Sequence, residues 1–198
     1  MKHTMMDSPI GVLLLVGEDE PERAVRGRTD SGNDVSVAGL YTAEHVRLPT
    51  PPGDRDDAAF ARATEELTEY FEGQRRDFDV CLNPRGTEFQ RHVWSALRSI
   101  PFGHTASYAD IAAAVGRPSA VRAVGAANGR NPISIIVPCH RVVGSNGALT
   151  GYAGGLEAKN WLLTHERAVA GLASAGSPSN AVSAVSAGSA SGVRLSGQ

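Results

Sequence analysis

The chain has 198 residues, 41% of them hydrophobic, and a formal net charge of −2 at pH 7. This length suits one large domain or two small ones, and the near-neutral total says little about partners. The two cysteines, Cys81 and Cys139, exclude a disulfide framework and a cysteine-based zinc site. The histidines lack paired ligand spacing, so we expect no metal.

Charge is distributed unevenly along the chain. Residues 1–83 contain 9 Lys and Arg against 17 Asp and Glu, whereas residues 84–168 contain 9 against 4. An acidic half joined to a basic half favours contact of the second half with a polyanion. A basic solvated face without a ligand would explain the same charges.

The apolar run at 10–16 is too short to cross a bilayer. It follows Asp7, Ser8 and Pro9 and leads into the acidic residues 18–20, which is a poor match to a signal peptide. We therefore expect a soluble protein of the reducing cytoplasm, without a membrane partner.

The first half predicts a small α/β unit. Residues 8–16 are expected to form one arm of an antiparallel hairpin, and 35–40 a second strand. Apolar residues recur at helical spacing over 57–71, and Gly73 ends that helix. Residues 78–82 alternate as a strand does, with Cys81 interpreted as structural because no partner group adjoins it. The sequence Asn83-Pro84-Arg85-Gly86 is a plausible domain boundary.

The second half predicts helices over 87–99, 107–115 and from 118 or 119 to 128. Thr87 can cap the first of them. The second and third are short and joined by a turn containing Gly116, which predicts a helix-turn-helix. The third consists almost wholly of small residues, so its backbone can approach another surface closely. Arg122 near its start favours a nucleic-acid contact over an ordinary solvated arginine.

The run 133–137 predicts an apolar strand that carries Cys139 to its end, where Pro138 removes a backbone donor. Side chains alternate faces along a strand, so Cys139 and His140 would point apart and a bridging water is expected between them. A histidine in this role needs a group that fixes its tautomer, usually a carboxylate or a carbonyl on its other nitrogen. The best-placed one is Glu166, in a predicted helix over 156–167. A buried structural cysteine would be the alternative.

Two further segments complete the pattern. Residues 145–148 indicate a turn, and 151–155 a flexible connection. Residues 169–198 are rich in Ala, Ser and Gly, with almost no charge or aromatic residues, and are predicted to be disordered.

These motifs together resemble the O6-alkylguanine-DNA alkyltransferases, the methylated-DNA–protein-cysteine methyltransferase family. The resemblance is carried by Pro138-Cys139-His140-Arg141-Val142 after Asn131-Pro132, by the preceding helix-turn-helix, and by the closing segments 151–155 and 159–166. It is dense over 84–167 and looser at 8–11 and 70–73.

The resemblance implies an α+β fold in two domains and a disordered tail. A small ribonuclease-H-like α/β domain would cover 1–83, a winged-helix-like (helix-turn-helix) DNA-binding and catalytic domain 84–168, and the tail 169–198. The implied activity is direct, single-turnover transfer of an alkyl group from O6-alkylguanine, and also O4-alkylthymine, to Cys139. No cofactor is implied, and the expected partner is double-stranded DNA, met by a monomer from its minor-groove side.

The resemblance also assigns roles to individual residues. The implied catalytic set is Cys139, His140, Glu166, Tyr108 and Asn131, with Tyr108 donating to guanine N3 and Asn131 supporting the turn. The implied substrate-binding and DNA-binding set is Arg122, Tyr108, Ala120, Ala123, Ala127, Asn128, Arg141, Val142, Tyr152 and Ala153. Arg122 would fill the stack that the flipped nucleotide leaves.

Four departures and two rival functions accompany this resemblance, and the first departure is that the acidic segment 17–57 fits the family poorly. Ala153 stands where serine is common, Asn128 and Gly129 differ from some relatives, and the metal site of some relatives is not matched in the first domain. A DNA-binding module without transfer activity, either a lesion sensor or a transcription factor, is one rival. A cysteine hydrolase using Cys139 and His140 is the other, although no oxyanion-hole motif is visible.

Overall fold

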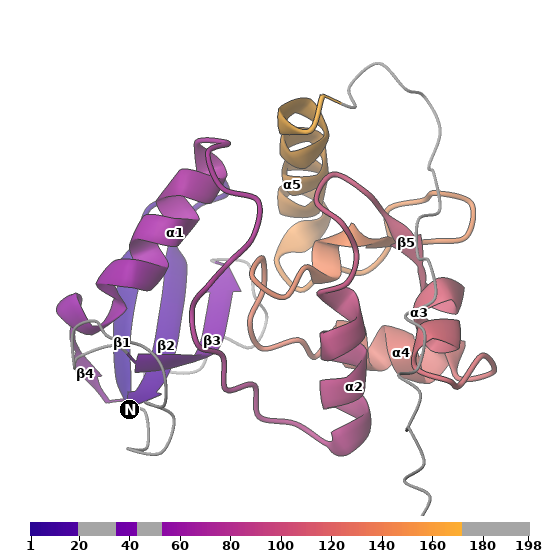
Figure 1. Ribbon diagram of the computed structural model, residues 1–198, viewed down its shortest axis with the longest axis horizontal. Helices are drawn as coiled ribbons and strands as arrows, with labels where there is room; N and C mark the ends of the chain where they lie inside the picture. Colours follow the sequence, from indigo (N-terminus) through magenta and orange to yellow (C-terminus); the bar gives the residue numbers. More distant parts are fainter. Residues whose placement is uncertain (20–34, 43–52, 172–198) are drawn as a thin grey trace, which may run out of the picture.

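The computed structural model describes residues 1–19, 35–42 and 53–171. Most of the acidic segment between 17 and 57 and nearly all of the predicted tail therefore lie outside the described residues. Within the described part, no helix combines the length and apolar character needed to cross a membrane. The two halves of the chain form a sheet-and-helix unit and a helical unit that lie side by side (Figure 1).

A four-stranded sheet forms the centre of the first half. Its strands are β1 (Lys2–Met6), β2 (Leu13–Asp19), β3 (Val35–Thr42) and β4 (Asp54–Arg55), in the order β3-β2-β1-β4. β2 pairs antiparallel with β1 and β3, and β4 is parallel to β1. The predicted hairpin strand is thus real but begins at Leu13, because residues 8–11 form the turn from β1, with Gly11 at φ 93°. β1 was not predicted from the sequence.

One helix covers this sheet. A short 3-10 turn, η1 (Ala58–Phe60), leads into α1 (Ala61–Phe71), as the apolar spacing predicts. Phe60, Leu67 and Tyr70 are at most 1% exposed and belong to the same core cluster as Leu13 and Leu15 of β2. Burial of such side chains contributes about 2 kcal/mol each, so this face of α1 holds the helix on the sheet.

The predicted strand at 78–82 is wrong. Only Leu82 forms a bridge, to Val37, and the segment otherwise crosses the edge of β3. Two main-chain bonds fix that crossing: Val37 donates to the carbonyl of Cys81 at 2.9 Å, and Asn83 donates to the carbonyl of Val37 at 2.8 Å. Apolar and polar residues alternate in this segment because Phe78, Val80 and Leu82 lie on one side of an extended loop and pack against the core.

Four helices build the second half. They are α2 (Glu88–Leu97), α3 (Tyr108–Ala114), α4 (Val121–Asn128) and α5 (Gly155–Val169). Two strands of two residues each, β5 (Ala106–Ser107) and β6 (Val142–Val143), pair in parallel. Thr87 caps α2 through a full capping box, as predicted, and Ser107 caps α3 in the same way. α3 and α4 are the two helices of the predicted helix-turn-helix. The Trp94 indole donates to the carbonyl of Ala127 at 2.9 Å, which fixes α2 against α4.

Candidate active site

The segment before Cys139 is a tight turn, and the predicted strand over 133–137 is wrong. Asn131 replaces the missing sheet partners: its Nδ2 donates to the carbonyls of Ile133 at 3.3 Å and Val137 at 2.8 Å, and its Oδ1 accepts from the Ile133 amide at 3.1 Å. Within the turn Ile135 has a φ of 72°, which is strained for a β-branched residue. Asn131 therefore supports the turn, as the family resemblance implies.

The first half of the chain helps to hold this turn. The Leu40 amide of β3 donates to the carbonyl of Pro132 at 2.8 Å, and the Ser134 amide donates to the carbonyl of Leu40 at 3.1 Å. The edge of the sheet thus pairs with the segment that delivers the cysteine, although more than ninety positions separate them in sequence.

Cys139 begins a short 3-10 helix, η2 (Cys139–Arg141), and is 4% exposed. The Asn128 side chain donates to the Cys139 carbonyl at 3.4 Å and so connects α4 with the cysteine backbone. The helical turn, rather than a strand, sets the relative directions of the cysteine and histidine side chains.

His140 lies against Glu166 of α5. Its Nε2 is 2.8 Å from Glu166 Oε1, and both side chains are 0% exposed. An ionised carboxylate accepts only, so Nε2 carries the proton and Nδ1 is the basic nitrogen. Nδ1 is buried and has no hydrogen-bond partner within the described part of the chain. The predicted pairing of His140 with Glu166 is confirmed.

Glu166 accepts hydrogen bonds from three further groups. Arg141 donates from Nε to Oε2 at 2.9 Å and from Nη2 to Oε1 at 3.0 Å. The amide of Gly103 donates to Oε2 at 3.1 Å, and the hydroxyl of Tyr70 donates to Oε1 at 2.8 Å. The carboxylate is therefore bound by donors from three different segments of the chain.

The position of Arg141 corrects the expectation that it binds DNA. Its side chain is 7% exposed, and its third nitrogen, Nη1, donates to the carbonyl of Ile100 at 2.7 Å. A guanidinium that is buried and bound in this way cannot meet a phosphate in this conformation. It instead provides the countercharge of the relay carboxylate.

The electrostatics of the site favour a neutral imidazole beside a protonated thiol. Burial raises the pKa of Cys139, and burial lowers the pKa of His140 against the opposing effect of Glu166. Burial alone would raise the pKa of Glu166, but His140 and Arg141 lower it far below its usual range. Since Arg141 already balances the Glu166 charge, His140 stays neutral and can accept a proton.

Lys159 places a positive charge close enough to Cys139 to affect its thiol. It is fully buried, and its Nζ donates to the carbonyls of Val142 and Thr150, both at 2.6 Å. Burial lowers the pKa of Lys159 to about 8, and the interaction with Cys139 opposes that change. The ammonium charge in turn lowers the pKa of the thiol, which offsets part of the effect of burial.

The helix-turn-helix presents only some of the predicted DNA-binding residues. Arg122 and Ala123 are exposed on α4, and Ala120 is half-buried at its N-cap. Ala127 and Asn128 are each 2% exposed and face the interior, which corrects the expectation that their side chains contact DNA. The helical period explains this, because both residues share the face of Val124, which packs in the core.

Tyr108 and the segment 150–153 are more exposed than Cys139 and His140. The Tyr108 ring lies over Gly125 of α4, where an added Cβ would be 3.8 Å from it, and Thr150 donates to the Tyr108 hydroxyl at 3.4 Å. The Tyr152 ring meets the His140 imidazole edge-on at 6.5 Å between centroids. Ala153 is half-buried beside it, and Val142 is buried, with its carbonyl bound by Lys159.

Sequence reasoning gave no role to Tyr70 or Lys159 and gave the wrong role to Arg141. Tyr70 lies 96 positions from Glu166, so no local pattern connects them. The best available signals were a tyrosine at a core position of a predicted helix and a lysine on the apolar side of another, since buried polar groups need partners.

Comparison with known proteins agrees with this geometry. A family model described as "6-O-methylguanine DNA methyltransferase, ribonuclease-like domain" matches residues 1–84, and one described as "6-O-methylguanine DNA methyltransferase, DNA binding domain" matches residues 88–168. A methylated-DNA–protein-cysteine methyltransferase of Mycolicibacterium paratuberculosis is 45% identical over 168 residues, covering 84% of this chain and 93% of that protein. The constitutive enzyme of that name from Bacillus subtilis is 44% identical over 166 residues, covering 83% and 94%.

A solved structure extends the similarity to three dimensions. The crystal structure of Mycobacterium tuberculosis OGT in complex with DNA superposes with a TM-score of 0.73 at 43% identity, covering 85% of this chain and 94% of that one. The two-domain α+β architecture implied by the sequence is confirmed by these matches. The chain belongs to the 6-O-methylguanine DNA methyltransferase family.

Proposed function

We propose that this protein repairs alkylated DNA by moving the alkyl group of O6-alkylguanine irreversibly onto Cys139. The observation that carries the proposal is the buried row of Cys139, His140 and Glu166 beside a helix-turn-helix with an exposed arginine. The names of the curated relatives support the same reaction class.

The reaction is a displacement at the alkyl carbon. The Cys139 thiol gives its proton, through one bridging water, to Nδ1 of His140, and Glu166 stabilises the resulting imidazolium. The thiolate attacks the alkyl carbon, a C–S bond forms, and the bond from that carbon to guanine O6 breaks with its electron pair on the base. The product is a thioether that water does not readily displace, so each molecule acts once and needs no cofactor.

The leaving base is stabilised by Tyr108 and by the segments around Val142 and Ala153. The Tyr108 hydroxyl accepts from Thr150 and so keeps its own proton free to donate to guanine N3. The base would then be contacted by the main chain at Val142 and Ala153 and by the ring of Tyr152. The same chemistry extends to O4-alkylthymine, which also leaves through an exocyclic oxygen.

DNA contact is assigned to α3 and α4. The exposed small residues Ala123 and Ala126 let α4 lie close to the minor groove, and Arg122 beside them can occupy the stack after the nucleotide flips out. The relative solved in complex with DNA supports a duplex partner. We further propose that the protein acts in the cytoplasm, as a monomer.

Arg122→Ala tests this contact. The variant should slow repair of a methylated duplex about tenfold or more, because the flipped state loses its stacking partner, while reaction with free O6-benzylguanine changes less than about twofold. Single-turnover rates on both substrates give the ratio. Equal losses on both would remove Arg122 from the flipping step.

The central test is alkyl transfer followed by peptide mapping. After incubation with duplex DNA containing O6-methylguanine, mass spectrometry should find one methyl group on the peptide that carries Cys139, in stoichiometric yield. Cys139→Ser should bind the lesion without modification. If the wild-type protein binds the lesion but Cys139 stays unmodified, the protein is a lesion sensor. If it turns over an ester repeatedly, it is a hydrolase.

A further inference from the structure

The relay carboxylate is bound from the first half of the chain as well as from the second. Tyr70, near the end of α1, donates its hydroxyl to Oε1 of Glu166 at 2.8 Å, and the same oxygen is 2.8 Å from Nε2 of His140. We propose that Tyr70 is a positioning residue for alkyl transfer, which donates to this oxygen and so limits how strongly the oxygen attracts the proton of His140. The inference rests on the function proposed above.

The remaining donors show why Tyr70 acts on the imidazole rather than on the carboxylate's location. Arg141 binds both oxygens of Glu166, and the Gly103 amide binds Oε2, so the carboxylate stays anchored without Tyr70. Oε1 divides its charge among Tyr70, His140 and Arg141. Removal of the tyrosine donor leaves more of that charge for the Nε2–H of His140, which makes the imidazole hold a proton more tightly.

The direction of the bond from Tyr70 is fixed. Tyr70 is 0% exposed, and burial together with the Glu166 charge raises its pKa well above the usual value, so the hydroxyl keeps its proton. Rings of Phe71, Phe78, Phe102 and His165 surround it, with centroids 5.4 to 6.0 Å away. The His165 Nε2 also lies 2.8 Å from the Tyr70 carbonyl, which ties the backbone to α5. A phenylalanine can therefore fill the same space.

Other titratable groups near His140 do not duplicate this effect. Glu166 favours its protonated form, while the charges of Arg141 and Lys159 oppose it. Tyr152 contacts the imidazole with its ring edge, and the Cys139 thiol is the proton source. Apart from His140 itself, Tyr70 is the neutral side-chain donor to Glu166 within the described residues.

Tyr70→Phe tests the role through a pH profile. The acid limb of the single-turnover rate with O6-benzylguanine should move up by about half a pH unit, which is about a threefold loss of rate well below the midpoint. Above the limb the rate should stay within about twofold, because the imidazole is then unprotonated in both proteins. A nitrogen-15 NMR titration of His140 should show its pKa raised by the same amount.

Thr68→Val is the matched control. It removes another hydroxyl from α1, where Thr68 is exposed and donates only to the Thr64 carbonyl at 2.8 Å, and should leave both titrations unchanged. Identical wild-type and Tyr70→Phe titrations of His140, or a rate loss of equal size at every pH, would overturn the role of Tyr70. Absence of transfer by the wild-type protein would instead overturn the repair function itself.

Discussion

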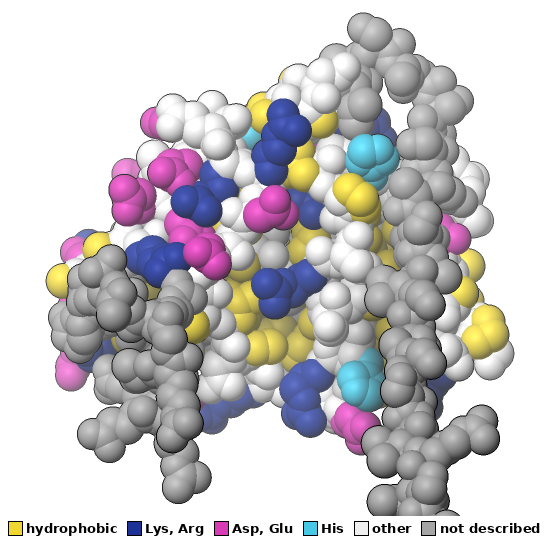
Figure 2. Space-filling model, viewed as in Figure 1, with side chains coloured by type: hydrophobic (Ala, Val, Ile, Leu, Met, Phe, Trp, Pro, Cys, Tyr) yellow, Lys and Arg dark blue, Asp and Glu magenta, His cyan; other side chains and the backbone are white. Residues whose placement is uncertain are grey.

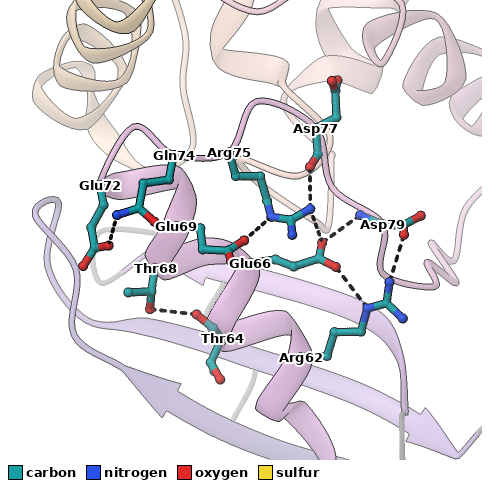
Figure 3. Close-up of polar contacts among 10 residues, drawn as sticks. All are labelled: Arg62, Thr64, Glu66, Thr68, Glu69, Glu72, Gln74, Arg75, Asp77 and Asp79. Atoms are coloured by element: carbon teal, nitrogen blue, oxygen red, sulfur yellow. Dashed lines mark hydrogen bonds and ion pairs between the residues drawn. The ribbon is translucent and has the colours of Figure 1, made fainter. Parts of the chain in front are cut away.

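Glu66 and Glu166 are two buried carboxylates in different halves of the molecule, with side chains 4% and 0% exposed. Glu66 of α1 accepts from Nε of Arg62 at 3.0 Å and from the Asp79 amide at 2.7 Å, and Arg75 lies 3.7 Å away (Figure 3). Figure 2 shows acidic side chains gathered on the side of α1, with basic ones among them. Glu166 has the same kinds of donors, an arginine and a backbone amide.

Two differences separate these networks. Arg62 and Arg75, which pair with Glu66, are 35% and 29% exposed, so solvent screens their charges. Arg141 is 7% exposed and is screened much less. Only Glu166 has an imidazole on one of its oxygens, and that imidazole adjoins a thiol. Glu66 therefore holds the loop after α1 in place, whereas Glu166 supports proton transfer in the reaction proposed above, although both carboxylates are paired with arginine.

Replacing each carboxylate by its amide should give the largest difference in activity between the two networks. Glu166→Gln should lower the single-turnover rate about 100-fold, because a neutral amide cannot stabilise the imidazolium of His140. Glu66→Gln should change the rate of the folded protein less than about twofold. Rates with methylated duplex, corrected for the folded fraction, measure both. A large rate loss in Glu66→Gln would mean that the network on α1 reaches the active site.

Replacing the arginine of each network by lysine should separate them by stability. Arg141→Lys should lower the free energy of unfolding by about 2–4 kcal/mol, since the bidentate pair and the bond to Ile100 are buried. Arg62→Lys should cost less than about 1 kcal/mol, because its partners are reached near solvent. Urea unfolding of both variants gives the values. Similar costs would show that burial does not distinguish the two sites.

The smallest expected effect is on how the free energy of unfolding depends on pH. Burial lowers the folded-state pKa of His140, so the unfolded chain binds that proton more readily and stability falls as pH drops below about 6.5. The folded-state pKa of Glu166 is also lowered, so its contribution is present above about pH 4.3 and is lost as pH falls further.

Each group accounts for at most about 1.4 kcal/mol per pH unit within its window. Unfolding free energies of wild type and Glu166→Gln between pH 7 and pH 3 measure these slopes. The variant should lose the steeper slope below about pH 4.3. Parallel curves for the two proteins would show that Glu166 is not held ionised by its neighbours.

Local patterns were sufficient for much of the architecture. Thr87 and the apolar spacing after it placed α2, and the spacing before Gly73 placed α1. Both succeed because caps and helical faces depend on residues three or four positions apart. The run 133–137 failed because its apolar residues are buried by a turn that the Asn131 side chain holds, which periodicity cannot distinguish from a strand.

The sequence by itself determined the helices, the Cys139–His140–Glu166 set and the family to which they belong. Tertiary structure decided that Arg141 turns inward to Glu166, that Asn128 supports the Cys139 backbone, and that Tyr70 reaches the relay from the other domain. These contacts join residues between 11 and 96 positions apart. A buried charge takes whichever donors packing brings within reach, and packing is a property of the whole folded chain.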